Sequence, residues 1–175
     1  MAPPTEVFRY CPRCGAARFD TVYGRAKHCR SCDFTYWFNA SAAVAALIVD
    51  PLGRLMLTRR AVEPFRGMLD LPGGFVDPLE TVEHALTREL KEELGADVAR
   101  AEFFLSFPNE YPFSGLTVYT IDIAFFVELK SLDALTPMDD ISEILFFRPA
   151  DIPLDSIPAV SIRRIVEEAV KKLSR

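Results

Sequence analysis

Three carboxylates lie close together along one uninterrupted segment of the chain. Glu89, Glu92 and Glu93 are three and four residues apart, and no Pro or Gly occurs between Glu80 and Leu94. On a helix, such spacings place side chains on one face as near neighbours. Carboxylates grouped at the edge of a core repel one another and lose hydration. A hard divalent cation, Mg²⁺ or Mn²⁺, offsets both costs and leaves positions open for the phosphates of a substrate.

The element that must carry these carboxylates is a helix predicted from Glu80 to Leu94, with Gly95 as its left-handed C-cap. At about 100° per residue, Glu89 and Glu93 fall inside the apolar arc of this helix. The residues that form the arc are Val82, Ala85, Leu86, Leu90 and Leu94. The alternative is a charged, solvated helix face, which most Glu-rich stretches form. The angular placement favours a metal site over that alternative.

A short strand ends in two glycines before this helix, and glycine lets backbone pass close to an ion or ligand. Together, the glycines and the charged residues match the spacing of the Nudix box. The matching residues are Gly74, Glu80, Arg88, Glu89, Glu92, Glu93 and Gly95. The chain therefore resembles the Nudix hydrolases, which cleave a diphosphate linked to a second moiety, X.

The resemblance implies a role for individual residues. It implies that Glu89, Glu92 and Glu93 bind the divalent ions, that the carbonyl of Gly73 is a further ligand, and that Arg88 orients a glutamate through a salt bridge. Glu80 matches the conserved glutamate of the preceding loop. The segment from residue 77 to residue 80 departs from the family pattern and also has the sequence of a capping box, which would start the helix one turn earlier.

The four cysteines form two CxxC pairs, Cys11 with Cys14 and Cys29 with Cys32, and fourteen residues separate the pairs. This arrangement matches a four-cysteine structural zinc site that is closed to substrate. Two disulfides and a redox-active CxxC are the alternatives. We favour zinc because residues 1–6 show no hydrophobic signal peptide and because nothing around Cys11 resembles the thioredoxin motif.

A zinc ribbon followed by a Nudix domain resembles the bacterial NADH pyrophosphatases. Those enzymes carry a downstream signature, Ser-Gln-Pro-Trp-Pro-Phe-Pro, that is tied to NADH preference. In the corresponding stretch, residues 106–114, only Ser106 and Pro108 match without a gap. NADH is thus one candidate among several substrates.

Residues outside the box supply further candidates. Glu143 resembles a family glutamate that binds metal or positions the attacking water, with an ordinary strand-edge glutamate as the alternative. Glu89 and Glu143 are both candidates for the general base. Arg59 is a candidate for contact with phosphate, because the planar guanidinium of Arg suits bidentate contacts.

A loop predicted from Pro108 to Gly115 carries three candidate base-binding residues, Asn109, Tyr111 and Phe113. The aromatic rings would stack on a base and the amide would hydrogen-bond to it. The alternative is that the rings seal the end of the sheet or a dimer contact. This loop is the place where we expect the choice of X to be made.

The net charge of −5 is unevenly distributed. Residues 1–37 hold six Lys or Arg and three Asp or Glu, for +3, so the remainder carries −8. Zinc and four thiolates would lower the first segment to about +1. This balance argues against nucleic acid as a general partner, with a capped RNA end as the exception. The longest apolar run, residues 42–49, is too short to span a bilayer, and a cytoplasmic enzyme is expected.

These observations predict an α+β protein with a zinc ribbon at residues 1–37 and a Nudix α/β/α sandwich with a mixed sheet at residues 38–175. The predicted activity is metal-dependent hydrolysis of a nucleoside diphosphate linked to X, such as NADH, ADP-ribose or a related dinucleotide. The alternative is a zinc ribbon that binds nucleic acid or protein, joined to a non-catalytic Nudix domain that senses a ligand. The family resemblance also implies a homodimer.

Overall fold

The computed structural model describes residues 2–174 and divides the chain into two compact units. The first unit holds residues up to Ser41 together with Glu110–Tyr119, and the second holds Ala42–Asn109 and Thr120 onward. Each unit is described by itself.

The first unit is built around a small antiparallel sheet. It contains α1 (Pro4–Val7) and the strands β1 (Phe19–Val22), β2 (Ala26–Cys29) and β3 (Thr35–Trp37), in the order β1-β2-β3. Its core is small and consists of Cys11, Phe19 and Cys29. The cysteines are therefore the centre of this unit as well as its candidate metal ligands.

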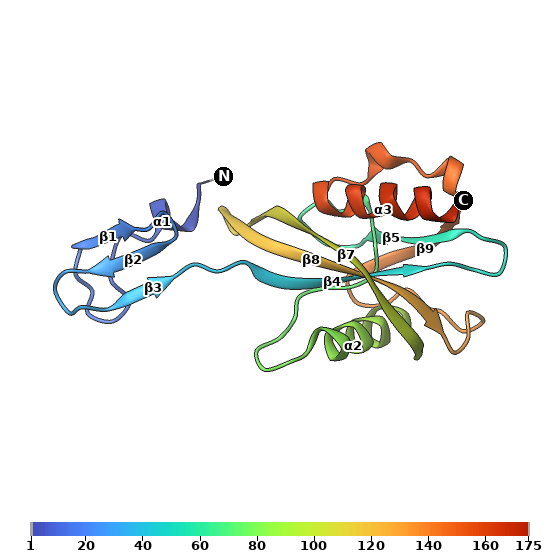
Figure 1. The fold of residues 1–175 in the computed structure, drawn as a ribbon, viewed down its shortest axis with the longest axis horizontal. Helices are drawn as coiled ribbons and strands as arrows, with labels where there is room; N and C mark the ends of the chain where they lie inside the picture. The colour runs from blue at the N-terminus through green and yellow to red at the C-terminus, as the bar shows by residue number, and fades with distance from the viewer. Residues whose placement is uncertain (1, 175) are drawn as a thin grey trace. The chain divides into compact units, whose positions relative to one another are not determined.

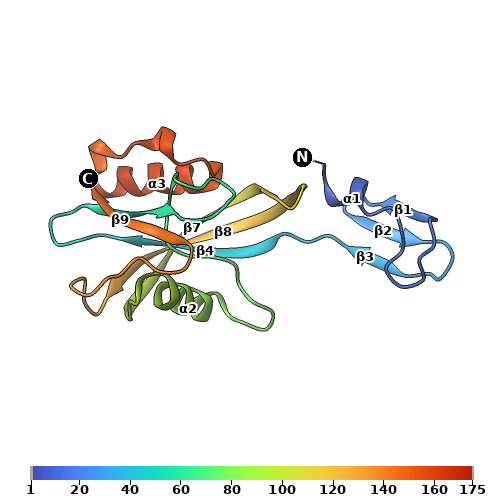
Figure 2. The same cartoon turned by 180° about the vertical axis from the view of Figure 1, so that it is seen from behind.

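Two three-stranded sheets and two long helices form the second unit. One sheet has the order β4-β8-β7, with β4 (Ser41–Ile48), β7 (Val98–Phe113) and β8 (Leu116–Leu129). The other has the order β6-β5-β9, with β5 (Leu55–Arg60), β6 (Leu69–Asp70) and β9 (Ile141–Phe147), and its strands are antiparallel. Figure 1 labels the paired strands β5 and β9 next to each other, and Figure 2 shows β9 from behind. In Figure 1, β4 and β8 run in the same direction, as expected for the predicted mixed sheet.

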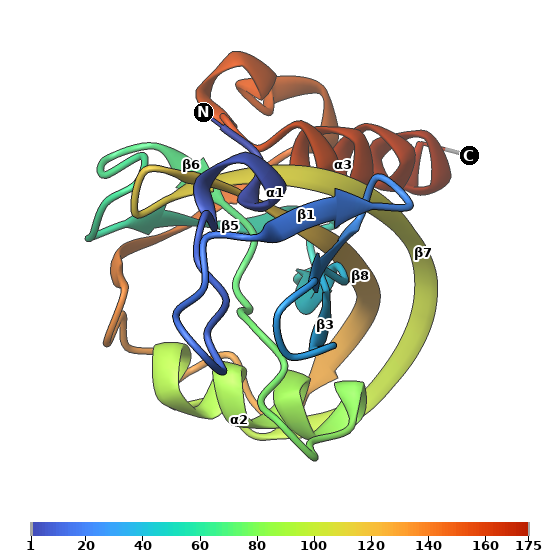
Figure 3. The same ribbon diagram turned by 90° about the vertical axis from the view of Figure 1, so that its left-hand side faces the viewer.

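The helices α2 (Val82–Leu94) and α3 (Val160–Leu173) lie on opposite sides of the sheets, as Figures 1 and 3 show. Two short 3-10 helices, η1 (Pro149–Asp151) and η2 (Leu154–Ser156), precede α3. Strand β4 is buried on both faces, which explains its continuous apolar sequence. Its residues Val44, Ala46 and Ile48 join the core under α2, while Ala45 and Leu47 join the core under α3. The predicted α+β sandwich is confirmed.

The loop predicted from Pro108 to Gly115 is wrong, because β7 continues as a strand to Phe113. Prolines are tolerated in a strand at the edge of a sheet, and β7 is an edge strand. The turn is confined to Ser114 and Gly115, whose φ angles of 49° and 78° suit the tight turn of a β-hairpin. Phe113 and Tyr111 consequently project from a long hairpin rather than from a loop.

Within the described residues 2–174, no helix is both long and apolar enough to cross a membrane.

Candidate active site

Helix α2 begins later than the sequence suggested. The Thr81 hydroxyl accepts a hydrogen bond from the His84 amide at 3.2 Å, and Thr81 is the N-cap. Residues 77–80 instead form a turn, in which Leu79 has a φ of 68°. Gly95 ends the helix with a φ of 67°, as predicted. The cap and the apolar face together fix the rotation of α2, and hence the direction of its carboxylates.

Glu93 is a carboxylate within the core-facing side of α2, and the residue is only 7% exposed. Its Oε2 accepts a hydrogen bond from the Gly73 amide at 2.8 Å. Burial raises the pKa of Glu93 to about 8, and the nearby carboxylates of Glu89, Asp70 and Asp140 add to the effect, while the Gly73 amide opposes it. No cationic side chain of residues 2–174 forms an ion pair with Glu93. A buried carboxylate in this condition is suited to a divalent cation.

Glu89 lies against the glycines that precede the helix. A Cβ added to Gly74 would come within 2.5 Å of the Glu89 carboxylate. A Cβ on Gly73 would lie 2.1 Å from the Val44 carbonyl oxygen, and Gly73 has a φ of 138°. Burial raises the pKa of Glu89, although Arg88 opposes this. Gly74 is therefore required for the strand end to approach the Glu89 carboxylate, and Gly73 for its close approach to the backbone of β4.

Arg88 connects the carboxylates of this region. Its guanidinium donates two hydrogen bonds to Glu80, at 2.9 and 3.0 Å, and one to the Phe75 carbonyl at 3.0 Å. Its Nη1 donates to Glu89 at 2.8 Å and to Glu92 at 3.1 Å. The hydrogen bonds from Arg88 and from the Asp77 amide lower the pKa of Glu80 to about 2.

The three glutamates do not form a ready-made cage. Among residues 2–174, only the cysteines place three or more metal-ligating atoms within 4.8 Å of one another. Arg88 Nη1 lies between the carboxylates of Glu89 and Glu92 and holds them. A buried carboxylate, a partly buried one and an exposed one, all oxygen donors, nevertheless fit Mg²⁺ or Mn²⁺, which prefer oxygen ligands and retain water.

Glu143 and Arg59 lie directly opposite each other on β9 and β5. Arg59 Nε donates a hydrogen bond to Glu143 Oε2 at 2.7 Å, and its Nη1 donates to the Gly67 carbonyl at 2.9 Å. Both side chains remain partly exposed, Arg59 at 38% and Glu143 at 49%. The structure thus pairs a candidate phosphate ligand with a candidate base, a contact that sequence spacing does not reveal.

The candidate base-binding residues are divided between the two units. Tyr111 and Phe113 belong to the first unit, while Asn109 and the glutamates belong to the second. The rings of Tyr111 and Phe113 are 6.3 Å apart and nearly parallel, at 19°.

The cysteines come together as predicted. Cys11 Sγ lies 3.7 Å from Cys32 Sγ, and Cys14 Sγ lies 3.6 Å from Cys29 Sγ. These separations are too long for disulfides, so that alternative is wrong. With Zn–S bonds of about 2.3 Å, tetrahedral geometry requires sulfur atoms roughly 3.8 Å apart, which the structure closely matches. The four thiols therefore fit one tetrahedral metal ion.

Several contacts of the site were absent from the sequence-based prediction. The Phe75 carbonyl accepts a hydrogen bond from Arg88, and Asp70 and Asp140 lie close enough to Glu93 to raise its pKa. No spacing rule links Asp140 to the helix. The contact of the Phe75 carbonyl could have been suspected from the position of Phe75 directly after the two glycines.

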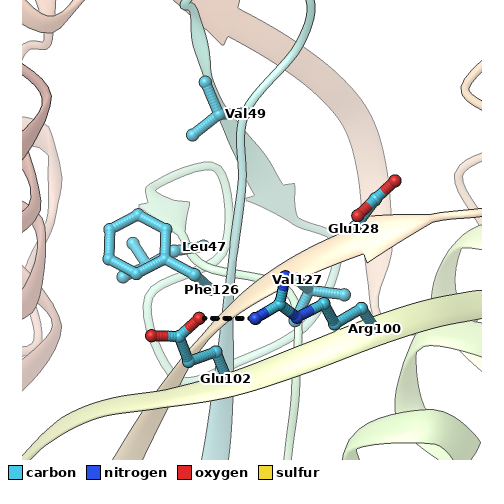
Figure 4. A pocket seen from close by; sticks show the side chains of 7 residues that line it. All are labelled: Leu47, Val49, Arg100, Glu102, Phe126, Val127 and Glu128. Atoms are coloured by element: carbon cyan, nitrogen blue, oxygen red, sulfur yellow. Dashed lines mark hydrogen bonds and ion pairs between the residues drawn. The ribbon is translucent and has the colours of Figure 1, made fainter.

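A hollow of about 230 Å³ lies elsewhere in the second unit, over β4, β7 and β8 (Figure 4). Its rim carries an ion pair between Arg100 and Glu102, at 3.3 Å. None of the predicted site residues lines it. The residues that line it are Leu47, Val49, Arg100, Glu102, Phe126, Val127 and Glu128.

Known proteins are similar to this chain over most of its length. A family model described as NUDIX domain matches residues 40–168. A NAD-capped RNA hydrolase, NudC, of Deinococcus radiodurans is 28% identical over 171 residues, which are 94% of this chain and 58% of that protein. The protein of the same name from Shigella flexneri is 28% identical over 164 residues, 93% of this chain and 60% of its own length. The chain thus spans about three fifths of these curated relatives.

Solved structures share the fold. A NUDIX hydrolase from Nitrosomonas europaea has a TM-score of 0.66 at 22% identity and covers 94% of this chain and 91% of its own. The NUDIX domain of Shewanella oneidensis NrtR, crystallised with ADP ribose, has a TM-score of 0.59 at 22% identity and covers 77% of this chain and 89% of its own.

Proposed function

Because the chain belongs to the Nudix family, we propose that it hydrolyses a nucleoside diphosphate linked to X, giving a nucleoside monophosphate and phosphorylated X. The observation that carries this proposal is the intact carboxylate set on α2. Glu93 is buried beside the Gly73 amide, and no cationic side chain of the described residues pairs with it, while Arg88 holds Glu89 and Glu92. A degenerate box would have favoured a protein that only senses a ligand.

The residues that would hold Mg²⁺ or Mn²⁺ are Glu89, Glu92, Glu93 and the carbonyl of Gly73. When bound, such an ion neutralises charge on the diphosphate and acidifies a water molecule. Arg88 would keep Glu89 and Glu92 oriented, because its guanidinium already contacts both. Glu89 and Glu143 are the candidates for the base that accepts the proton of the attacking water.

Arg59 would bind a substrate phosphate through the guanidinium edge that Glu143 and Gly67 leave free. Its pairing with Glu143 keeps a positive charge beside a candidate base. This arrangement supports a shared role for the two residues in the reaction.

The proposed substrates are NADH, ADP-ribose or a related dinucleotide, including the NAD-capped end of an RNA. Two observations support this range: the relatives named NAD-capped RNA hydrolase and the ADP ribose held by a protein of the same fold. Tyr111, Phe113 and Asn109 are proposed to contact the base.

The remaining features belong to the same proposal. Zinc is proposed as the ion of the four cysteines, with a structural role, and the chain is proposed to divide into a ribbon at residues 1–37 and a Nudix domain at residues 38–175. A cytoplasmic homodimer is proposed from the family resemblance.

The test is turnover of a substrate panel with Mg²⁺ or Mn²⁺, with products identified by mass spectrometry. The panel contains NADH, ADP-ribose, diadenosine polyphosphates, nucleotide sugars and nucleoside triphosphates. We expect Glu92→Gln to lose most of the activity and Glu83→Gln, an exposed change on the same helix, to retain it. No turnover of any substrate, or equal turnover by Glu92→Gln, would sink the proposal.

A further inference from the structure

Two aromatic rings lie exposed on the first unit, stacked on each other. The rings of Tyr23 and Trp37 have centroids 5.5 Å apart and planes only 7° from parallel. Tyr23 is 81% exposed and Trp37 is 42% exposed. The guanidinium of Arg25 lies 5.1 Å from the centroid of the Trp37 ring. One face of Tyr23 is covered by Trp37, so its high exposure leaves the other face open to solvent.

The backbone places these rings at some cost to stability. Tyr23 lies in the turn between β1 and β2 with a φ of 53°, a conformation that a bulky residue rarely adopts. Asn or Gly would suit this position better. Trp37 lies on β3, opposite Ala26 of β2. Stacking on Trp37 offsets part of this cost and leaves the outer face of the Tyr23 ring open to solvent.

The cations of residues 1–37 outnumber the carboxylates, and Arg25 is the cation shown in contact with the ring pair. Both aspartates of residues 1–37 already have partners, since Asp20 pairs with Arg30 and Asp33 with His28. No ion pair among residues 2–174 involves the other four arginines of this segment. These are Arg9, Arg13, Arg18 and Arg25. Their guanidinium groups therefore remain available to phosphates.

We propose that Tyr23, Trp37 and Arg25 form a stacking site for the bases of a single-stranded nucleic acid. A base stacks on the open face of Tyr23, and Arg25 contacts a backbone phosphate. Stacking accepts any base, so the site binds RNA and DNA without marked sequence preference. The modest net charge of the segment is no obstacle, because stacking rather than long-range steering supplies the affinity. This binding is separate from hydrolysis and does not require the α2 carboxylates.

Trp37 is the only tryptophan of the chain, so its fluorescence reports on this site alone. The test titrates the full chain, in buffer of low ionic strength without Mg²⁺, with uncapped 12-nucleotide strands of RNA and of DNA. We expect both strands to quench Trp37 emission and a DNA duplex of the same sequence to do so far less, because its base faces are already stacked. Omission of Mg²⁺ and of the cap separates this result from that of the hydrolysis proposal.

Tyr23→Asn removes the ring and tolerates the positive φ, so the turn is preserved. We expect it to weaken binding of the labelled strand about 5- to 100-fold in an anisotropy titration. Tyr23→Phe retains the ring and should bind as the wild type does. Tyr10→Asn, at another exposed Tyr of the same unit, is the matched control and should leave the affinity unchanged. Zinc content confirms that each variant is folded.

Two outcomes would overturn the proposal. One is a Trp37 emission that does not change when either strand is added. That result would indicate that the Tyr23 and Trp37 rings bind a protein instead of a nucleic acid. The other is binding that Tyr23→Asn and Tyr10→Asn weaken equally, which would indicate contact by charge alone.

Discussion

Gly73 and Gly74 are adjacent residues that exclude a side chain for different physical reasons. At Gly73 the obstacle is fixed, because a Cβ would meet the Val44 carbonyl and the φ of 138° is unfavourable for other residues. At Gly74 the obstacle is the carboxylate of Glu89, the end of a side chain that can rotate away. Gly73 is therefore required by the fold, whereas Gly74 is required for the position of Glu89, a proposed metal ligand.

This difference predicts two phenotypes. Gly73→Ala should lower the free energy of unfolding by at least about 2 kcal/mol. Gly74→Ala should change stability little but reduce turnover at least tenfold, because Glu89 must leave its position. Urea unfolding followed by circular dichroism and initial rates on the best substrate would measure the two effects. Equal stability losses with equal activities would contradict this division of roles.

Asp50 supplies a prediction of pH dependence. Its carboxylate accepts hydrogen bonds from the amides of Leu52 and Arg54 and pairs with the Arg54 guanidinium. Burial opposes ionisation of Asp50, but these contacts, chiefly those of Arg54, outweigh it and hold the pKa below its usual range. A depressed pKa means that this stabilisation is present above the pKa of the unfolded chain, about 4, and is lost as the pH falls through the folded value.

Asp50→Asn should therefore be less stable than the wild type at pH 7, and the difference should shrink below about pH 4. The measurement is the urea midpoint at pH 7 and at pH 3, followed by circular dichroism. Asp155→Asn changes a fully exposed aspartate and should match the wild type at both values. A stability difference between Asp50→Asn and the wild type that grows as the pH falls would contradict the predicted direction.

At the scale of elements, α2 depends on its N-cap for the direction of its glutamates. Thr81→Ala removes the hydroxyl that accepts from the His84 amide and should cost about 1 kcal/mol. Thr87→Ala is the matched control, because Thr87 lies inside the helix, where Ala is the better helix former. Urea unfolding should show a loss for the first variant and no loss for the second. Equal effects would mean that Thr81 does not act as a cap.

The same helix shows how far sequence reasoning extends. The face that bears Glu89 and Glu93, and the end at Gly95, follow from local periodicity and were predicted. The start was placed too early, because residues 77–80 also form a capping box and local rules do not decide between two adjacent caps. The contact between Arg59 and Glu143 depends on how β5 and β9 align, and local periodicity contains no such information.

Strand β7 illustrates a different limit. Pro108 and Pro112 suggested a loop, because proline cannot donate to a strand ladder. That rule applies to strands with neighbours on both sides, and within the described residues 2–174 the sheet order gives β7 only β8 as a neighbour. The position of a strand within its sheet is a property of the whole fold, so this error follows from reasoning about one segment at a time.

At the scale of the molecule, the described part of the first unit has a small core in which the cysteines take a large share. Such a small unit needs a metal or a similar link to remain folded. Chelation of the proposed zinc at neutral pH should shift Trp37 emission to longer wavelengths and make four thiols reactive. Withdrawal of Mg²⁺ alone should do neither. Four thiols that react at once without a chelator would contradict a bound metal.

The turn at Ser114 and Gly115 has a consequence for how this protein can change in evolution. The chain passes between the two units three times, at residues 41–42, 109–110 and 119–120, because the hairpin tip belongs to the first unit. In that unit the Thr117 amide donates to the Ala2 carbonyl at 3.1 Å, and Leu116 bridges to Ala2. Deletion of the segment before residue 42 would therefore leave Leu116 and Thr117 at the hairpin tip without their backbone contacts to Ala2. We expect that relatives without the cysteine pairs also have a shorter hairpin, so that the two features are gained and lost together.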